Sequence, residues 1–147
     1  MKMDVVELER TPVLGVKVDV KQSEIGHRIG ELLPQLMKVA GSQAAGAPLA
    51  RWHAWKDDVG TMELAVPVKR ALPATGRFQP DALPGGKAIV TWHVGPYDDL
   101  HVTWKALREA MKERGLEGRA EPWEEYVSDC SSVPADQVRT RIVWPIR

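Results

Sequence analysis

The sequence predicts an α+β fold of two βαββ units, with antiparallel sheets, a pseudo-two-fold axis relating the units and a ligand cleft at their junction. The order strand, helix, strand, strand occurs twice along the 147 residues. The last strand of each half also carries a proline at the matching position, Pro67 and Pro145. A stretch rich in proline and glycine, residues 69–86, separates the halves. We therefore expect a single domain over residues 1–147, with repeat halves of about 1–70 and 76–147.

The first half opens with strands and a helix. Alternation of apolar and charged residues over 13–20 predicts a half-buried strand, and residues 5–10 alternate as a separate short strand. Apolar residues then recur every three or four positions over residues 25–40, which predicts an amphipathic helix. We expect Ser23 to be the N-cap of this helix and Gly41 to follow its end. Pro34 is expected to kink it.

The remaining elements follow from the same patterns. The first half continues with expected strands at residues 51–56 and 61–68, and then the loop at 69–86. The second half is expected to contain a strand at 87–94, a turn ending in the helix cap Asp99, and a helix from residue 100 that Gly115 ends as C-cap. Strands are then expected at 122–129 and 139–146.

Composition excludes several classes of protein. Lys and Arg number 20 and Asp and Glu number 20, so no basic surface is expected to bind nucleic acid directly. No apolar run is long enough to span a membrane, and the N-terminus does not resemble a signal peptide. The single cysteine, Cys130, excludes an internal disulfide, so we expect a cytoplasmic protein. No cofactor or metal site is expected, because there is no phosphate loop and the histidines are widely spaced: His27, His53, His93 and His101.

Tryptophan is the unusual feature of the composition. There are six Trp residues against two Tyr and one Phe. A buried indole N–H needs a hydrogen-bond partner, so Trp is not the simplest residue with which to fill a core. The six residues suggest a surface for flat apolar or cationic ligands, with a Trp-rich core as the alternative. We interpret Trp104, on the apolar stripe of the second helix, as core.

Four motifs of the second half resemble the GyrI-like small-molecule-binding family. His93 to Leu100 is similar to the family's H-x-G-P-Y-x-x-L turn into a helix, and Trp104 to Leu107 to its W-x-x-L. Residues 123–129 resemble its W-E-x-Y-x-x-D strand, and residues 140–146 its closing T-E-I-x-W-P strand. In the first half, residues 51–53 look like the family's R-Y-H.

The resemblance implies a duplicated βαββ fold with a central cleft, lined by aromatic residues and one acid, that binds bulky aromatic or cationic compounds. The family is related to effector-binding domains of MerR- and AraC-type multidrug regulators, and some stand-alone members open the cyclopropane of alkylating natural products. Three positions depart from its motifs: Trp52, Cys130 after Asp129, and Arg141. Arg141 replaces a glutamate, so it either reverses the charge around the cleft or faces solvent. We find no helix-turn-helix segment, so the chain is not expected to act as a regulator by itself.

Glu124 is the principal candidate for the site. Strand alternation places Glu124 and Tyr126 on one face and Trp123 and Glu125 on the other, with Glu125 expected to face solvent. A carboxylate beside a phenol could bind an organic cation, or act as a base if it is desolvated. The other candidate ligand-binding residues, each with a core or capping role as the alternative, are Trp52, Trp55, Trp92, Tyr97 and Trp144. We interpret His93 as a structural residue that bonds the Gly95–Pro96 turn.

Three functions follow from these residues and the resemblance. The favoured one is a stand-alone binding protein for bulky aromatic or cationic compounds, in an aromatic cleft with Glu124 as counter-charge. The second is a hydrolase of cyclopropane-bearing alkylating compounds, in which Glu124 positions or deprotonates a water molecule and Tyr126 or a tryptophan of the cleft orients the substrate. The third is an interaction module acting on DNA gyrase. The sequence leaves open the identity of the ligand, whether the chain is an enzyme, and its oligomeric state.

Overall fold

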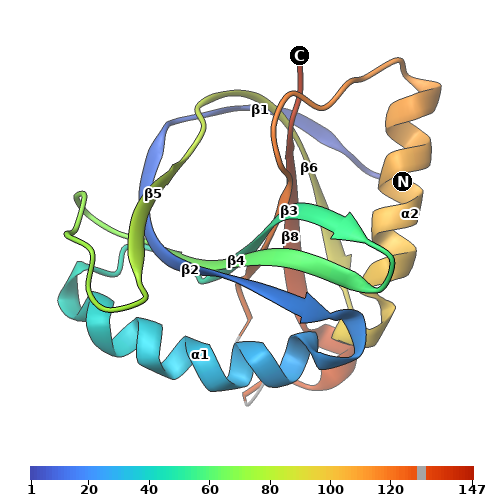
Figure 1. Ribbon diagram of the computed structural model, residues 1–147. Coiled ribbons are helices and arrows are strands. Elements are labelled where there is room, and N and C mark those ends of the chain that lie inside the picture. Colours follow the sequence, from blue (N-terminus) through green and yellow to red (C-terminus); the bar gives the residue numbers. More distant parts are fainter. Residues whose placement is uncertain (129–131) are drawn as a thin grey trace. The chain divides into compact units, whose positions relative to one another are not determined.

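The computed structural model describes residues 1–128 and 132–147, and these form two compact units (Figure 1). Unit 1 contains Met1–Leu8 and Gly86–Arg147, and unit 2 contains Glu9–Gly85. Each unit holds four antiparallel strands and one helix of three or more turns, so the fold is of the mixed α+β class. The predicted pseudo-two-fold axis and the cleft at the junction stay predictions.

Unit 2 is built around the long strand β2. In its sheet the strand order is β3-β4-β2-β5. Its elements are β2 (Thr11–Lys21), α1 (Ile25–Ala40), β3 (Leu49–Lys56), β4 (Val59–Pro67) and β5 (Gln79–Leu83). α1 runs along β2 and β4 (Figure 1). Its buried residues are Leu32, Leu36 and Ala40.

The predicted first helix is confirmed over its full range, with corrections at its start and in the following loop. Gly41 follows its end with a φ of 53°, a backbone conformation that favours glycine. Ser23 is not the N-cap, because a short 3₁₀ turn, Gln22–Glu24, precedes the helix and no side chain caps it. The expected loop at residues 69–86 contains the strand β5, which its prolines and glycines concealed.

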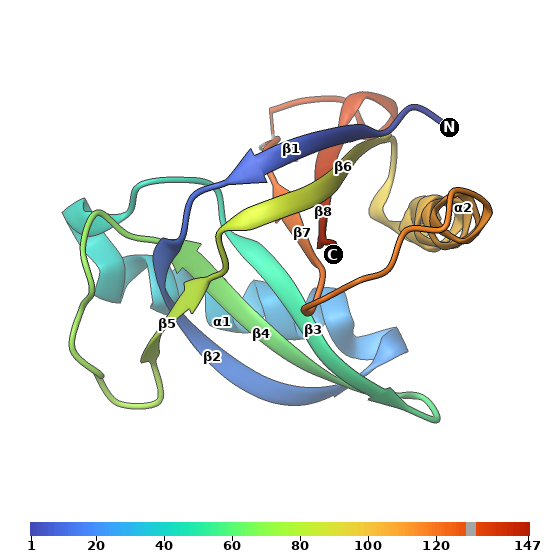
Figure 2. The same cartoon turned by 90° about the horizontal axis from the view of Figure 1, so that it is seen from above.

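Unit 1 has the strand order β1-β6-β8-β7. Its elements are β1 (Asp4–Leu8), β6 (Gly86–Val94), α2 (Leu100–Glu113), β7 (Trp123–Tyr126) and β8 (Arg139–Pro145). β1 confirms the predicted short strand, and it runs antiparallel beside β6 (Figure 2). Asp99 does not cap α2 with its side chain, because a 3₁₀ turn, Tyr97–Asp99, leads into the helix.

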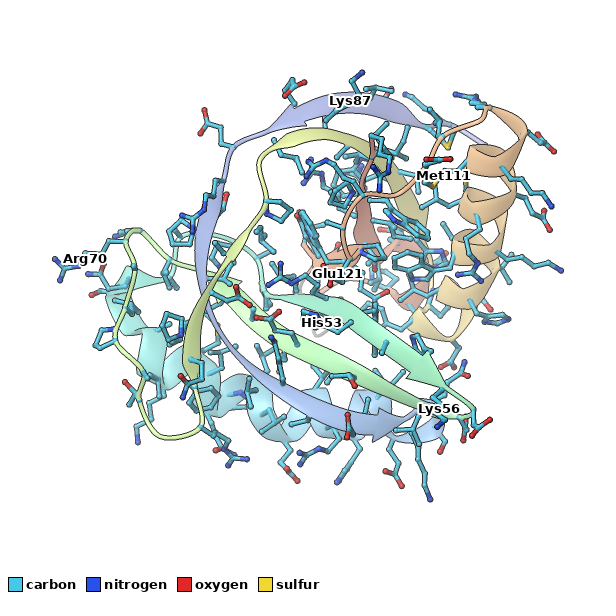
Figure 3. The ribbon with its side chains drawn as sticks, turned by 45° about the horizontal axis from the view of Figure 1, so that its top comes forward. His53, Lys56, Arg70, Lys87, Met111 and Glu121 are labelled. Carbon is cyan, nitrogen blue, oxygen red and sulfur yellow. The ribbon has the colours of Figure 1, made fainter. Side chains whose placement is uncertain are left out.

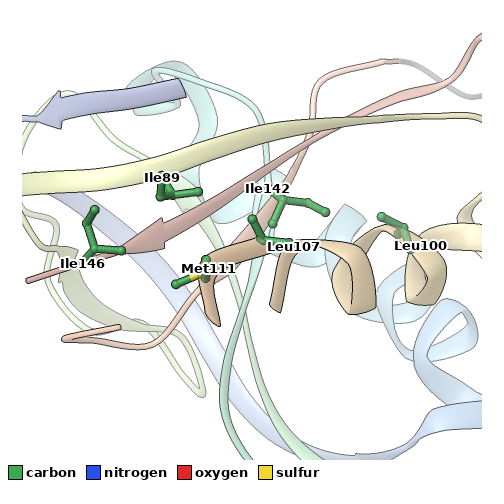
Figure 4. Packing of buried hydrophobic residues seen from close by; sticks show 6 residues of the cluster. All are labelled: Ile89, Leu100, Leu107, Met111, Ile142 and Ile146. Carbon is green, nitrogen blue, oxygen red and sulfur yellow. The ribbon is translucent and has the colours of Figure 1, made fainter. Parts of the chain in front are cut away.

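α2 packs on one face of the unit 1 sheet. Leu100, Leu107 and Met111 of the helix meet Ile89, Ile142 and Ile146 in a buried cluster (Figure 4). Burying such side chains supplies the main stabilisation of a helix on a sheet, about 1.5–3 kcal/mol for each. Trp104 and Trp144 pack against the edge of this cluster. The residues of β6, β7 and β8 that share a face with Ile89 and Ile142 therefore lie on the α2 side of the sheet.

Neither α1 nor α2, the helices of the described residues, has the length and apolar content that crossing a bilayer requires. The predicted strand at 122–129 is observed from Trp123 to Tyr126. Asp129 and Cys130, where the chain departs from the expected motif, lie outside the described residues.

Candidate functional site

Glu124 is buried on the α2 side of the unit 1 sheet. Only 5% of the residue is exposed. Tyr126, two positions along β7, donates a hydrogen bond from its hydroxyl to Glu124 Oε1 at 2.7 Å. This contact confirms that Glu124 and Tyr126 share a face. The carboxylate therefore lies away from bulk water with a phenol beside it.

The second carboxylate oxygen is held by the helix. The indole Nε1 of Trp104, on α2, donates a hydrogen bond to Glu124 Oε2 at 2.9 Å. The interpretation of Trp104 as core is therefore incomplete, because its ring packs on the core cluster while its N–H binds the candidate site. The signal that could have revealed this is the demand of a half-buried indole N–H for an acceptor, and Glu124 is a buried acceptor in the same unit.

Two further aromatic rings extend this group. Tyr97 makes an edge-to-face contact with Tyr126, with ring centroids 5.6 Å apart. Trp144 makes a similar contact with Trp104 at 5.9 Å. We call Tyr97, Trp104, Glu124, Tyr126 and Trp144 the Glu124 cluster. The cluster consists of one buried carboxylate and four aromatic residues, all of them in unit 1. Each of these residues is a sequence-based candidate or part of a family motif.

Tyr126 is held in its protonated state. Burial raises the pKa of its phenol well above the usual value of 10.0, and the charge and hydrogen bond of Glu124 and the neighbouring Tyr97 raise it further. The hydroxyl therefore remains a hydrogen-bond donor at neutral pH. In this geometry Tyr126 orients Glu124 and cannot serve as a base.

The departure at Arg141 does not alter the charge beside Glu124. Arg141 stands opposite Glu125 in the β7–β8 pairing, on the face of the sheet away from α2. Its guanidinium donates to both oxygens of Glu125, at 3.0 and 3.1 Å. Glu125 also accepts a hydrogen bond from Trp123, and its side chain is 19% exposed, so the expectation that Glu125 faces solvent is met only in part. The positive charge that Arg141 introduces is therefore neutralised by Glu125, on the face of the sheet away from Glu124.

His93 has the structural role that the sequence predicted. Its Nε2 donates to the carbonyl oxygen of Pro96 at 2.9 Å, which ties β6 to the turn before α2. Its Nδ1 lies 2.7 Å from the Thr103 hydroxyl on the helix. With both ring nitrogens engaged, His93 fixes where α2 begins and so helps to position Trp104.

The structure does not place every candidate beside Glu124. Trp92 pairs with Arg141 in the β6–β8 register, so it lies on the opposite face of the unit 1 sheet. Trp52 and Trp55 belong to β3 in unit 2 and pack on each other with ring centroids 5.2 Å apart. A bulge between Trp52 and Ala54 shifts the register so that both rings lie on one face. Their part in binding stays a prediction.

Unit 2 holds a second buried polar group, on the face of its sheet away from Trp52. Arg51 Nε donates to Glu63 Oε1 at 2.9 Å, and His53 Nε2 lies 2.8 Å from the same oxygen. Arg51 also reaches Asp81 Oδ2 at 2.8 Å and the carbonyl oxygen of Ala82. Figure 3 shows His53 on β3 and Lys56 near the end of the same strand. Because β4 and β2 separate β3 from β5, the unit 2 sheet must be strongly curled for one side chain to join them.

No three His, Cys, Asp or Glu side chains of residues 1–128 and 132–147 converge in a way that would hold a metal ion. The Glu124 cluster is instead a single buried acid with aromatic neighbours. Such a group can bind a cation through charge and ring quadrupoles, or accept a proton.

Comparison with known proteins identifies the family. A family model for the GyrI-like small molecule binding domain matches residues 1–147. The chain belongs to this family. The resemblance of the second-half motifs is thereby confirmed. No curated protein matched this GyrI-like chain.

Solved structures confirm the fold of this GyrI-like domain. The crystal structure of the EcmrR C-terminal domain superposes with a TM-score of 0.86 at 19% identity, covering 99% of this chain and 97% of that one. EcmrR in its complex with DNA gives the same TM-score at 17% identity, and the chain spans 57% of that longer protein. SAV2435 bound to tetraphenylphosphonium gives 0.76 at 12% identity, covering 100% and 94% of the two chains. A hydrolase from Listeria innocua gives 0.61 at 15% identity, covering 99% and 92%.

Proposed function

We propose that this GyrI-like chain binds a bulky aromatic cation at the Glu124 cluster. The observation that carries the proposal is the burial of Glu124 between two hydrogen-bond donors, Trp104 and Tyr126. Both donors stabilise the ionised carboxylate, which then supplies a fixed negative charge among aromatic rings. The complex of SAV2435 with tetraphenylphosphonium supports this choice of ligand class, since that protein shares the fold.

The arrangement favours a cation with aromatic substituents. Removing a carboxylate from water makes its attraction to an organic cation stronger than it would be at the surface. The rings of Tyr97, Trp104, Tyr126 and Trp144 belong to the same cluster and would supply ring quadrupoles to the cation and apolar area to its substituents. The hydroxyl of Tyr126, which stays protonated, holds the carboxylate in one orientation.

Calorimetric titration with tetraphenylphosphonium tests the proposal. Glu124→Gln keeps the size of the side chain and removes its charge, so we expect binding to weaken by about 1–3 kcal/mol. Glu125→Gln is the matched control, because the neighbouring carboxylate lies on the other face and is paired with Arg141. Equal weakening by the two variants, or no binding by the unaltered protein to any of a panel of aromatic cations, would refute the proposal.

Hydrolysis of a strained electrophile is the second candidate, favoured by the likeness to the Listeria innocua hydrolase and by the pairing of Glu124 with Tyr126. Glu124 would take a proton from a water molecule whose oxygen attacks a cyclopropane carbon. The ring C–C bond would break, and its electron pair would pass to the conjugated acceptor of the substrate and be protonated there. Tyr126 would orient the carboxylate by donating its hydrogen bond.

Incubation with a cyclopropane-bearing alkylator, followed by mass spectrometry, distinguishes the two candidates. A hydrolase yields the water adduct, and Glu124→Ala abolishes it. Binding without any adduct supports the first candidate alone, and equal turnover by the unaltered protein and Glu124→Ala would rule out Glu124 as the base. The predicted action on DNA gyrase stays a prediction, and co-purification with gyrase at physiological salt tests it.

A further inference from the structure

The face of the unit 1 sheet away from α2 carries a cation stacked on an exposed indole. The guanidinium carbon of Arg139, on β8, lies 4.4 Å from the ring centroid of Trp92, on β6. Trp92 is 39% exposed, although a tryptophan of this size is usually more deeply buried. A guanidinium that lies over an indole ring can still donate hydrogen bonds from its edge.

The neighbours of this pair are exposed and apolar. Val94 stands opposite Arg139 in the β6–β8 register and is 59% exposed. Val127, one residue beyond β7, is 43% exposed. It adjoins Arg139 because the Arg139 backbone N–H donates to Ser128 Oγ at 2.9 Å. We call Trp92, Val94, Val127 and Arg139 the Arg139 patch.

The charge of the patch is not neutralised by the described part of the chain. Within residues 1–128 and 132–147, no carboxylate forms an ion pair with the Arg139 guanidinium. The nearest arginine on the same face, Arg141, is already paired with Glu125. Among the described residues, the patch therefore combines a cation that has no carboxylate partner with exposed apolar side chains.

We infer that the Arg139 patch is a docking surface for an acidic segment of another protein, in which an Asp or Glu carboxylate is flanked by apolar side chains. Arginine and tryptophan together dominate the energetics of protein interfaces. The guanidinium edge matches a carboxylate with two parallel hydrogen bonds. The apolar flanks would cover Trp92, Val94 and Val127, whose exposure has no role within the unit. This surface faces away from Glu124 and does not depend on the proposed ligand site.

Nuclear magnetic resonance of the ¹⁵N-labelled protein tests this inference, with a short blocked peptide of alternating glutamate and valine as the probe. We expect the peptide to shift the indole N–H signal of Trp92, and high salt to weaken its binding. The same peptide with lysine in place of glutamate is expected to leave the signal unchanged. Arg139→Gln should weaken the acidic peptide at least tenfold, while its dispersed spectrum shows that it is folded.

Lys105→Gln is the matched control, because it removes the same charge from an exposed position on α2. It is expected to bind the peptide as the unaltered protein does. The inference would be overturned if millimolar peptide left the indole signal of Trp92 unshifted, or if Arg139→Gln and Lys105→Gln changed the affinity for the peptide equally. It would also be overturned if free acetate at the same carboxylate concentration shifted that signal equally, which would indicate a small-anion site. Sedimentation showing that the unaltered protein dimerises, and that Trp92→Ala is monomeric, would assign the patch to a second copy instead.

Discussion

In each unit an ion pair joins the two strands that follow the helix, with the charges exchanged. In unit 2, Arg51 on β3 stands opposite Glu63 on β4. In unit 1, Glu125 on β7 stands opposite Arg141 on β8. The side chains of the first pair are only 7% and 3% exposed, whereas those of the second are 27% and 19% exposed. The ion pair on these two strands is therefore part of a buried network in unit 2 and is partly solvated in unit 1.

The two units differ more at the residue that precedes the ion pair on β3 and on β7. In unit 2 this residue is Ala50, fully buried opposite Leu64 on the sheet face that packs under α1. In unit 1 it is Glu124, buried opposite Ile142 on the face under α2. Unit 2 shows that such a helix–sheet interface forms with an apolar residue at this point. Burying a carboxylate there is costly unless it is hydrogen-bonded, and Trp104 and Tyr126 donate the hydrogen bonds that offset this cost for Glu124.

The largest expected effect tests whether the unit 2 pair is the more deeply buried. Arg51→Met leaves the Glu63 carboxylate, which is 2% exposed, without its main counter-charge. We expect the free energy of unfolding to fall by about 3–5 kcal/mol, measured by urea denaturation at neutral pH. Arg141→Met is the matched variant in unit 1, and it should cost less than about 1 kcal/mol because that pair is partly solvated. If the two variants lost the same free energy of unfolding, the two ion pairs would not differ in how deeply they are buried.

The pKa of Tyr126 tests whether the interface under α2 shields a buried carboxylate from water, at the place where the interface under α1 has an alanine. The chain has two tyrosines, so Tyr97→Phe leaves Tyr126 as the only one and keeps the three larger causes of its raised pKa, which are burial and the charge and hydrogen bond of Glu124. We expect its near-ultraviolet tyrosinate absorbance to appear only well above pH 10. Glu124→Gln in the same background should bring the pKa back towards 10.

The sign of the stability effect follows from the raised pKa. Tyr126 contributes stability that is fully present below the unfolded pKa of about 10 and is lost as the pH rises through its folded-state pKa. Tyr126→Phe serves as the control, because it reports Tyr97 alone. A Tyr126 that titrates like a free tyrosine would show that Glu124 and its donor are not shielded from water.

Asp81 gives the smallest expected effect and concerns the outer end of the unit 2 network. Burial raises the pKa of this carboxyl, but contact with Glu63, a hydrogen bond from the backbone N–H of Ala82 and the charge of Arg51 together lower it below 3.8. Its stabilisation is therefore present above about pH 4 and is lost as the pH falls through the lower folded-state value. Because the side chain is 36% exposed, Asp81→Asn should cost less than about 1 kcal/mol at pH 7.

Urea unfolding of the unaltered protein and Asp81→Asn at several pH values checks this prediction. The difference between them should be constant from pH 5 to 7 and vanish in strong acid. A difference that grows as the pH falls would have the wrong sign and would separate Asp81 from the Arg51 network.

Much of the fold could be predicted from the sequence, because local periodicity fixes helices and alternating strands. α1 was predicted over its whole length from one apolar stripe. β5 could not be, since its residues 79–83 sit among prolines and glycines and become a strand only by pairing with β2. The pairing of β1 with β6 was equally invisible, because it joins residues far apart in the sequence.

The candidate site was predicted in part for the same reason. Alternation along β7 placed Glu124 with Tyr126, and the hydrogen bond between them confirms it. Trp104 was missed because its contact with Glu124 joins a helix to a strand, and periodicity alone cannot show which strand residue a helix meets. The pairing of Arg141 with Glu125 needed the register of β7 against β8, which the sequence does not contain.

The charge of Glu124 is the centre of this account, and a comparison of two ligands tests it most directly. Tetraphenylphosphonium is a cation with four phenyl rings, and triphenylphosphine oxide is an uncharged compound with three, so each ligand is compared with itself between the two proteins. Calorimetric titration of both into the unaltered protein and Glu124→Gln isolates the interaction between that charge and the carboxylate. We predict that the variant loses about 1–3 kcal/mol with the cation and almost nothing with the oxide. An equal loss with both ligands would contradict the account, because the cluster would then bind aromatic rings without using its buried carboxylate.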